Sequence, residues 1–188
     1  MEKLILVGAG GFGRVLLEHV IKEYECAFLD DGHEIGTLVD GVPVIGKTGD
    51  MKKWFGEYKK LIVAVGNNKF RERMYEEAGK VGYEFPLFIH PSAYVSPHSQ
   101  LGPGTIILNN AVVQNGSKSG IGLIMNPGTE LHQDSEVGDC VLIYTNSVVR
   151  SLTHVGNRAW IGANATIGTG VTLPDDARVE DGEVVKPV

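Results

Sequence analysis

Residues 155–173 read VGNRAWIGANATIGTGVTL, with a large apolar residue at the first position and at every sixth position after it. The period runs from Ile89 to Val185, and sixteen of its seventeen positions are apolar, Ser119 being the exception. A small residue usually stands two places before each of these positions. A triangular coil of about eighteen residues turns one large and one small residue inward from each face, so this period predicts a parallel β-helix of hexapeptide repeats. Stacked coils then place residue n over residue n+18.

The first part of the chain has a different rhythm, in which apolar runs alternate with helical spacings. We expect strands over 3–7, 26–29 and 60–65, an extended piece over 42–45, and helices over 12–23, 49–55 and 70–81. Such alternation is typical of a parallel sheet with right-handed crossovers. The sequence therefore predicts an α/β, Rossmann-like domain over residues 1–86 and an all-β parallel β-helix over residues 87–188.

Composition narrows the class of protein. The 188 residues carry a net charge of −6 with a pI of about 5.5, which gives no support for nucleic-acid binding. No apolar run reaches the roughly 18 residues that a membrane span needs. Cys26 and Cys140 lie far apart and form no CxxC pair, so we expect reduced thiols in a cytoplasmic protein. The histidines show no spacing that predicts a metal site.

A glycine-rich turn follows the first expected strand and opens the first expected helix. Its residues are Gly8, Gly10, Gly11, Phe12 and Gly13. Glycines let backbone N–H groups approach a phosphate, and a helix N-terminus favours negative charge. The domain is half of a dinucleotide fold, so a UDP-sugar suits it better than NAD. The alternative is a tight turn that binds no ligand.

Two further groups of polar residues end the second and third expected strands. Asp30 and Asp31 are candidates for hydrogen bonds to the ribose or base of a nucleotide, or form an ordinary acidic turn. Residues 66–68 read Gly66-Asn67-Asn68, with Arg71 one helical turn later. They are candidates for holding a pyrophosphate or sugar, and a simple helix cap is the alternative.

Three stretches together resemble one family: GAGGFGR over residues 8–14, FLDD over 28–31, and IHPSAYV over 89–95 leading into the repeats. They are similar to the sialic acid O-acetyltransferase and UDP-4-amino-sugar N-acetyltransferase family, over nearly the whole chain. The resemblance implies a left-handed β-helix and a homotrimer. It also implies a nucleotide-linked sugar substrate at the N-terminal domain and acetyl-CoA bound along the helix between subunits. Where the family often has histidine, this chain has Phe12.

The resemblance also implies a catalytic centre, where a histidine acts as general base on the acceptor. Aligned on Gly128 and Gly138, Gln133 occupies the usual histidine position, and a glutamine cannot take a proton. His132, one place earlier, is the candidate base, with help from Asp134. The alternative for His132 is a solvated surface side chain beside Arg150.

The region of the acyl donor also departs from the family. Small residues usually stand where this chain has Arg150, Ser151 and Leu152, and the sequence ends at Val188 before the usual Pro-Ala-Lys segment. The implied acetyl-CoA contacts are Ser151, Gly162, Ala163, Gly168 and Thr169. Two functions stay open: an acetyltransferase acting on the nitrogen or oxygen of a nucleotide-linked sugar, and a non-catalytic, trimeric sugar-nucleotide-binding relative. A dehydrogenase is disfavoured, because nothing supplies a second redox domain.

Overall fold

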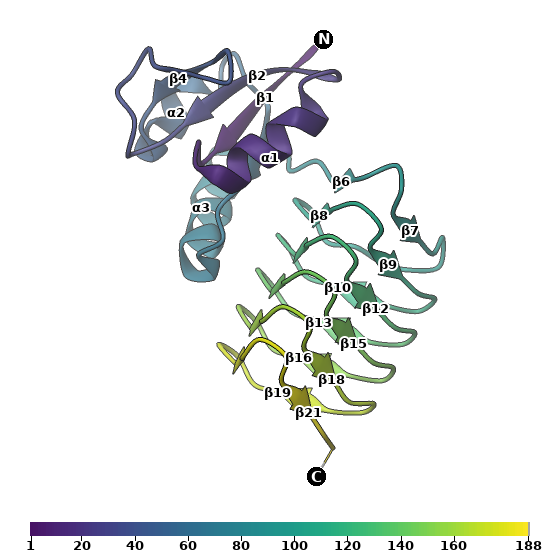
Figure 1. Cartoon of the computed structure of the whole chain (residues 1–188). Helices are drawn as coiled ribbons and strands as arrows, with labels where there is room; N and C mark the ends of the chain where they lie inside the picture. Colours follow the sequence, from purple (N-terminus) through teal and green to yellow (C-terminus); the bar gives the residue numbers. More distant parts are fainter. Residues whose placement is uncertain (188) are drawn as a thin grey trace. The chain divides into compact units, whose positions relative to one another are not determined.

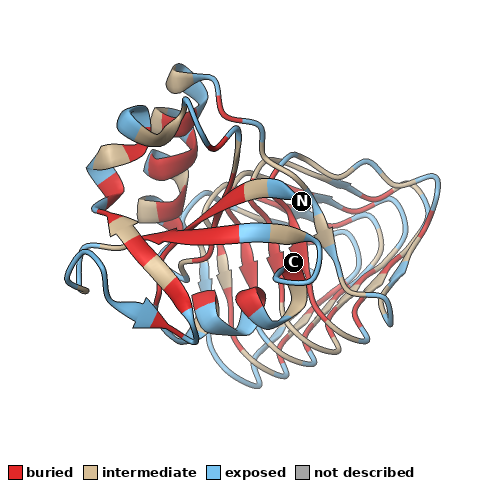
Figure 2. Cartoon of the chain, turned by 90° about the horizontal axis from the view of Figure 1, so that it is seen from above, coloured by how far each residue is buried: buried red, intermediate tan, exposed pale blue. Residues whose placement is uncertain are grey.

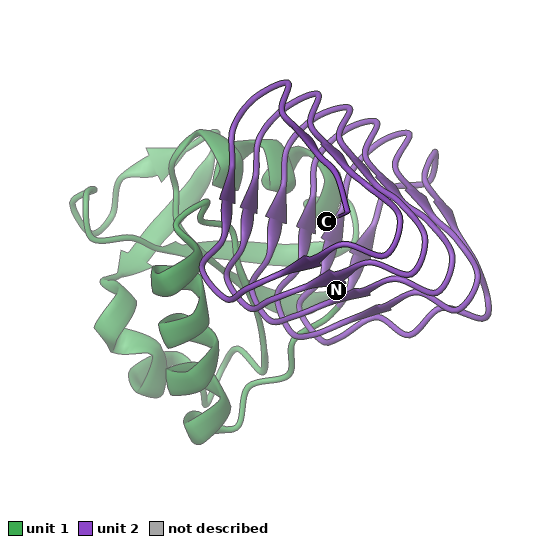
Figure 3. Ribbon diagram, turned by 90° about the horizontal axis from the view of Figure 1, so that it is seen from below, with its two compact units in different colours: residues 1–86 green, residues 87–188 purple. Residues whose placement is uncertain are grey.

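A computed structural model describes residues 1–187 and divides the chain into two compact units, Met1–Pro86 and Leu87–Val188 (Figure 3). The first unit contains, in chain order, β1 (Glu2–Val7), α1 (Gly11–Val20), β2 (Tyr24–Leu29), β3 (Leu38–Val39), β4 (Val42–Gly46), the 3-10 helix η1 (Thr48–Asp50), α2 (Met51–Trp54), β5 (Lys60–Val63) and α3 (Asn68–Val81) (Figure 1). These are the elements expected from the alternation, with the addition of β3.

The sheet of the first unit has the order β3-β4-β2-β1-β5. β1 runs parallel to both of its neighbours, β2 and β5. As expected for a strand inside such a sheet, its residues Leu4–Val7 are apolar and buried (Figure 2). α1 packs on β1 and β2, while α3 packs on β5 and α2. The expected parallel sheet is present in β4, β2, β1 and β5, and the antiparallel hairpin of β3 and β4 makes the whole sheet mixed. Asp40 and Gly41 turn this hairpin with φ angles of 48° and 84°, as a two-residue turn requires.

The second unit is built of two-residue strands. They are β6 (Phe88–Ile89), β7 (Tyr94–Val95), β8 (Ile106–Ile107), β9 (Val112–Val113), β10 (Lys118–Ser119), β11 (Ile124–Met125), β12 (Glu130–Leu131), β13 (Glu136–Val137), β14 (Leu142–Ile143), β15 (Val148–Val149), β16 (His154–Val155), β17 (Trp160–Ile161), β18 (Thr166–Ile167), β19 (Thr172–Leu173), β20 (Arg178–Val179) and β21 (Val184–Val185). They form three parallel sheets, β10-β13-β16-β19, β20-β17-β14-β11-β8-β6 and β21-β18-β15-β12-β9-β7, which is the arrangement of a left-handed parallel β-helix (Figure 1).

The register of the sheets confirms the rule that residue n stacks on residue n+18. Ile107 pairs with Met125, Met125 pairs with Ile143, and the pattern continues up the sheet. The second residue of each strand from β7 to β21, apart from Ser119 in β10, belongs to one aliphatic core. Ser119, the exception in the period, is tolerated because its Oγ accepts the Gly102 N–H at 3.1 Å.

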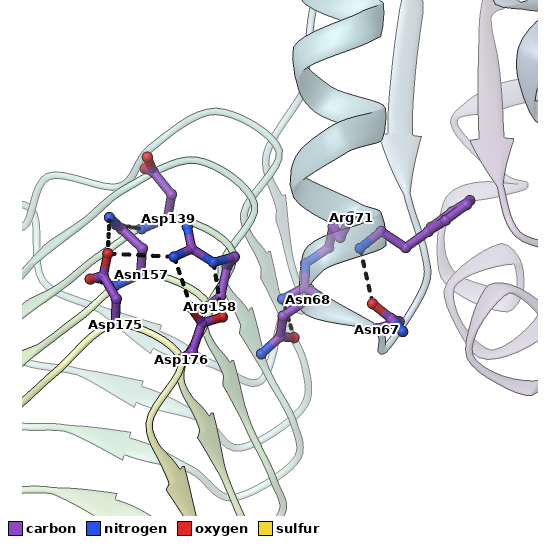
Figure 4. Close-up of polar contacts among 9 residues, drawn as sticks. Asn67, Asn68, Arg71, Asp139, Asn157, Arg158, Asp175 and Asp176 are labelled. Carbon is purple, nitrogen blue, oxygen red and sulfur yellow. Dashed lines mark hydrogen bonds and ion pairs between the residues drawn. The ribbon is translucent and has the colours of Figure 1, made fainter.

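Side chains at one corner join successive coils in a ladder. Asn157 Oδ1 accepts the Asp139 N–H at 2.8 Å, and Asp175 Oδ1 accepts the Asn157 N–H at 2.8 Å (Figure 4). Arg158 ties the same corner to the next coil through hydrogen bonds to Asp176. The bonds from Asp139 N–H and Asn157 N–H each satisfy a backbone donor of the turn, so the corners add to the stability that the core gives the stack.

The outward-facing first residues of the strands differ between two of the sheets. On β10-β13-β16-β19, here called the polar sheet, Lys118, Glu136 and His154 are exposed. Glu136 forms an ion pair with Lys118 and contacts His154. On β21-β18-β15-β12-β9-β7, here called the apolar sheet, the outward column consists of Tyr94, Val112, Glu130, Val148, Thr166 and Val184. One face is therefore fully hydrophilic, and the other presents apolar side chains.

Candidate functional site

The glycine-rich turn borders a hollow of about 410 Å³ within the first unit. The hollow is lined by Ala9, Gly10, Gly11, Arg14, His33, Thr37, Leu38, Val39 and Asp40. It lies at the N-terminus of α1, where unpaired backbone N–H groups and the helix dipole favour an anion. The arrangement suits the phosphates of a nucleotide.

The glycines of the turn have two different jobs. A Cβ at Gly13 would lie 1.9 Å from the Gly8 carbonyl oxygen, and a Cβ at Gly8, whose φ is 101°, would lie 2.6 Å from Val65. These two glycines let α1 approach the sheet. A Cβ at Gly10 or Gly11 would meet nothing within 4 Å. The fold does not need glycine there, and both residues leave their backbone open to the hollow. Phe12, the residue between Gly11 and Gly13, is half-buried.

The two aspartates after β2 are both held by the protein itself. Asp30 Oδ2 accepts the Ala9 N–H at 2.8 Å, and its Oδ1 accepts the Gly32 N–H at 2.8 Å and contacts His33 Nδ1 at 2.8 Å. Burial alone would raise the pKa of Asp30, but these hydrogen bonds outweigh burial and lower it. Asp31 accepts hydrogen bonds from the backbone and hydroxyl of Thr48. The structure therefore uses these carboxylates to shape the loop.

An ion pair borders the same hollow. Arg14 Nε donates to Asp40 Oδ2 at 2.7 Å, and Arg14 Nη2 donates to Asp40 Oδ1 at 3.1 Å. The hydrogen bond from Arg14 lowers the pKa of Asp40, so this carboxylate stays charged at neutral pH. Arg14, Asp40 and His33 were not among the residues predicted from the sequence. The Asp40-Gly41 dipeptide, a recognised hairpin signal, indicates that the loop folds back toward the turn.

Residues 66–71 have structural contacts (Figure 4). Asn67 Oδ1 accepts the Phe70 N–H at 2.9 Å and caps α3. Arg71 is fully buried, and it donates to the Val65 carbonyl at 2.7 Å and to Asn68 Oδ1 at 2.9 Å. Gly66 is exposed just before this cap. These contacts correspond to the helix-cap alternative, and the lining of the hollow comes from other residues.

In the second unit, His132 forms a pair with a carboxylate. Its Nε2 lies 2.9 Å from Glu130 Oε2, and the side chains of His132 and Glu130 are 25% and 44% exposed. Residues two apart on a strand share a face, which explains why these two meet at the apolar sheet. The carboxylate can only accept, so the contact holds the proton on Nε2 and leaves Nδ1 free to take a proton.

The two residues after His132 point to other partners. Gln133 is exposed, and its N–H donates to Gln114 Oε1 at 3.2 Å. Asp134 adopts a left-handed φ of 58°, and its carboxylate leans over Gly116, where an added Cβ would come within 2.2 Å of it. The carboxylate that contacts the ring of His132 in the structure is that of Glu130.

The five residues that the resemblance assigns to acetyl-CoA occupy two corners of the coils. Gly162 and Gly168 are buried, and an added Cβ would lie 2.5 Å from Asp181 Oδ1 or 2.8 Å from the Val185 carbonyl oxygen. The Ala163 N–H donates to Asp181 Oδ1 at 2.7 Å. Ser151 and Thr169 stand one coil apart, half-buried and exposed respectively. Stacking of coils explains both glycines, while Ser151 and Thr169 remain accessible.

One residue in this corner is unusual. Gly116, Asp134, Leu152 and Gly170 follow one another at intervals of eighteen residues, and all have φ near 60–73°. Leu152 is the bulky member, and it is 56% exposed. Left-handed backbone is unfavourable for such a side chain, so Leu152 is held there by the turn rather than by its own preference. Arg150, two places before it, is also exposed.

The part of the chain that the structure describes was searched for a metal site and for a membrane-spanning helix. No group of three or more histidine, cysteine, aspartate or glutamate side chains among residues 1–187 is placed to hold a metal ion. None of the helices in this range is long and apolar enough to cross a membrane.

Comparison with known proteins identifies both units. Residues 3–78 match the PglD N-terminal domain. The GDP-perosamine N-acetyltransferase of Escherichia coli O157:H7 is 28% identical over 179 residues, which cover 88% of this chain and 78% of that protein.

Two solved structures superpose on almost the whole chain. One is the acetyltransferase domain of PglB from Neisseria gonorrhoeae FA1090 in complex with acetyl coenzyme A, at a TM-score of 0.80 and 34% identity, covering 99% of this chain and 96% of that one. The other is a histidine-to-asparagine mutant of perosamine N-acetyltransferase from Caulobacter crescentus in complex with CoA and GDP-perosamine, at 0.93 and 29%, covering 98% and 89%. The chain belongs to the PglD-like family of sugar N-acetyltransferases, in which a PglD N-terminal domain precedes a hexapeptide-repeat β-helix.

Proposed function

We propose that this protein transfers the acetyl group of acetyl-CoA to the amino group of a nucleotide-linked amino sugar. The observation that carries the proposal is the likeness over almost the entire chain to acetyltransferases that bind acetyl-CoA, or CoA together with GDP-perosamine. The relatives act on nitrogen, which favours N-acetylation over O-acetylation.

The nucleotide fits the hollow of the first unit. Gly10 and Gly11 leave the backbone open, and the N-terminus of α1 supplies N–H donors for the diphosphate. Arg14 borders the same space and carries N–H donors, although its charge is balanced there by Asp40. The sugar-bearing end of the nucleotide then extends from the hollow. The nucleotide is UDP or GDP, as in the names of the relatives.

The acetyl transfer needs a group that removes one proton. The amine nitrogen attacks the thioester carbonyl carbon, a C–N bond forms, the C–S bond breaks, and CoA leaves as a thiolate that takes up a proton. His132 Nδ1 accepts the proton that the amine loses, and Glu130 holds the ring of His132 in the tautomer and orientation that this step needs. Gln133 can orient the substrate by hydrogen bonds but takes no proton.

The decisive experiment replaces the base. His132→Ala should lower kcat on the order of 100-fold, a typical share for a general base, with a smaller loss for Glu130→Gln. His154→Ala is the matched control, because His154 also pairs with a glutamate, Glu136, at 3.6 Å but lies on the polar sheet. Turnover is measured with acetyl-CoA and UDP- or GDP-linked 4-amino sugars. Full activity in His132→Ala would remove this residue from the mechanism.

One observation favours a second function, that of a sugar-nucleotide-binding protein without catalysis. Gln133 occupies the position at which the resemblance implies a catalytic histidine. Under that function the wild type binds acetyl-CoA and nucleotide sugar in calorimetry but transfers nothing, and Gln133→His creates activity. Under the proposed function the wild type is active, and Gln133→His raises its rate. The two outcomes separate the functions directly.

We also propose a homotrimer. The outward column of the apolar sheet presents Tyr94, Val112, Val148 and Val184, and Tyr94 and Val184 are 59% and 57% exposed. Such a face is typical of a subunit interface, and a head-to-tail contact closes into a ring. Light scattering should give about three times 20.3 kDa. Val148→Asp should reduce that mass, whereas Thr172→Asp on the polar sheet should leave it unchanged; a monomeric wild type would contradict the proposal.

A cytoplasmic location is part of the same proposal. Cys26 and Cys140 are buried and form no disulfide, which fits a reducing compartment. Burial raises the pKa of Cys26 to about 11, so its thiol stays protonated and unreactive at neutral pH.

A further inference from the structure

The end of β2 departs from the usual pattern of nucleotide-binding sheets. In such folds an acidic residue after the second strand accepts hydrogen bonds from the ribose hydroxyls. Asp30 stands at that place, but both of its oxygens are already engaged by Ala9, Gly32 and His33. Asp30 is also absent from the lining of the hollow, whereas the side chain of His33 belongs to it, so a ribose arriving there meets His33.

His33 is oriented for this contact. Its Nδ1 lies 2.8 Å from Asp30 Oδ1, and its side chain is 38% exposed and lines the hollow. A carboxylate partner holds the proton on Nδ1, so Nε2 is the remaining polar atom of the ring and carries a lone pair when His33 is neutral. The Lys47 ammonium donates to the carbonyls of Asp31 and His33 at 3.0 and 2.7 Å and fixes the loop. The histidine is therefore set in place before any ligand binds.

We propose that His33 reads the ribose of the bound nucleotide, with Nε2 accepting a hydrogen bond from a 2′- or 3′-hydroxyl, and that Asp30 acts through His33 as a positioning residue. The inference rests on the proposed function, because it assumes that the hollow receives a nucleoside diphosphate. It adds a contact by which the protein distinguishes ribonucleotides from nucleotides that lack the ribose hydroxyls.

The chemistry of the hollow favours the ribose over the phosphates as the partner of His33. A neutral Nε2 accepts a hydrogen bond, and a hydroxyl can donate one, whereas an ionised diphosphate has no proton to give. The diphosphate is better served by the N–H groups at the N-terminus of α1. Leu38, 66% exposed on the same hollow, offers an apolar surface for the base.

Calorimetry with matched nucleotides tests the contact. The wild type should bind UDP or GDP on the order of 10-fold more tightly than the corresponding 2′,3′-dideoxy nucleotide, since a hydrogen bond of this kind contributes about 1.4 kcal/mol. His33→Ala should bind both forms equally and weakly. His33→Gln, which keeps a polar atom near the position of Nε2, should recover part of the ratio. His154→Ala on the second unit should behave as the wild type.

Each outcome has a distinct meaning. If His33→Ala keeps the full preference for the ribose form, the inference is overturned while the proposed function stands. If the wild type binds neither UDP nor GDP at millimolar concentration, the proposed nucleotide site itself is wrong. Melting temperatures of all variants, measured without nucleotide, show that the loop variants are folded, because His33 lies on a partly exposed loop.

Discussion

Glycine serves the two units of this protein in different ways. In the β-helix, an added Cβ at Gly102, Gly120 or Gly138 would come within 2.2, 2.0 or 2.4 Å of atoms in the next coil. The turn after β1 contains a crowded glycine, Gly13, and a glycine that faces open space, Gly10. Crowded glycines allow one backbone segment to approach another.

The difference teaches that a glycine motif has to be read residue by residue. In GAGGFG the first and last glycines make the βα turn possible, and the middle two leave room for something outside the protein. The β-helix contains the crowded kind at every coil because its backbones stack directly. Three substitutions to alanine sharpen this comparison, from the largest expected effect to the smallest.

Gly13→Ala should be the most damaging substitution. The new methyl group would overlap the Gly8 carbonyl oxygen at 1.9 Å, a contact with rigid backbone that forces α1 away from the sheet. Overpacking of this severity costs about 3 kcal/mol or more of the free energy of unfolding. Urea denaturation followed by circular dichroism measures it. Gly11→Ala, in the same helix but facing open space, is the control and should be neutral or stabilising.

Gly138→Ala should have an intermediate effect. Its methyl group would lie 2.4 Å from Asn157 Oδ1 and 2.8 Å from the Asn157 backbone nitrogen, at a rung of the corner ladder. A loss of about 2 kcal/mol in the free energy of unfolding is expected. Gly170→Ala separates crowding from backbone strain, because its φ is 72° but nothing lies within 4 Å, so about 1 kcal/mol is expected. Equal losses for both would mean that crowding between coils is unimportant.

Gly10→Ala should barely change stability and should weaken ligand binding. The methyl group meets open space in the fold but occupies the hollow where backbone and diphosphate would approach. We expect a change of less than about 1 kcal/mol in the free energy of unfolding and a Kd for UDP or GDP that is on the order of 10-fold higher. Calorimetry and urea denaturation on the same samples give both numbers. Unchanged affinity would move the phosphates away from this turn.

Much of the fold was predictable from side-chain periodicity. The six-residue period gives the three sheets and the register of n over n+18, because an inward apolar residue must stack on another. The hairpin of β3 and β4 was missed, although Asp40-Gly41 is a known turn signal, because neither strand exceeds five residues and Leu38 is exposed. Only contact with β2 reveals β4 as part of the sheet.

Less of the candidate site was predictable. Glu130 as the partner of His132 follows from the two-residue alternation of a strand, a signal that was available. His33 and Arg14 border the same hollow only because the loop after β2 folds back to the turn after β1, and no sequence spacing encodes that approach. Asp30 was correctly placed at the end of β2, but its internal hydrogen bonds to Ala9 and His33 are a property of the folded loop.

The stacking of n on n+18 makes the coil a unit of length that can be added or removed whole. Duplication of eighteen residues would return every inward side chain to its own column and leave both flanking coils in register. Insertion of six residues would also keep large residues inside, but it would turn everything that follows by one face. Beyond the insertion, the continuation of the column Val112–Glu130–Val148 would lie on the polar sheet, and the continuation of the column Lys118–Glu136–His154 would lie on the third sheet. Core packing would not register that error. We expect such a protein to fold but to lose the proposed trimer interface, so the outer columns, and not the core, would restrict its length to whole coils.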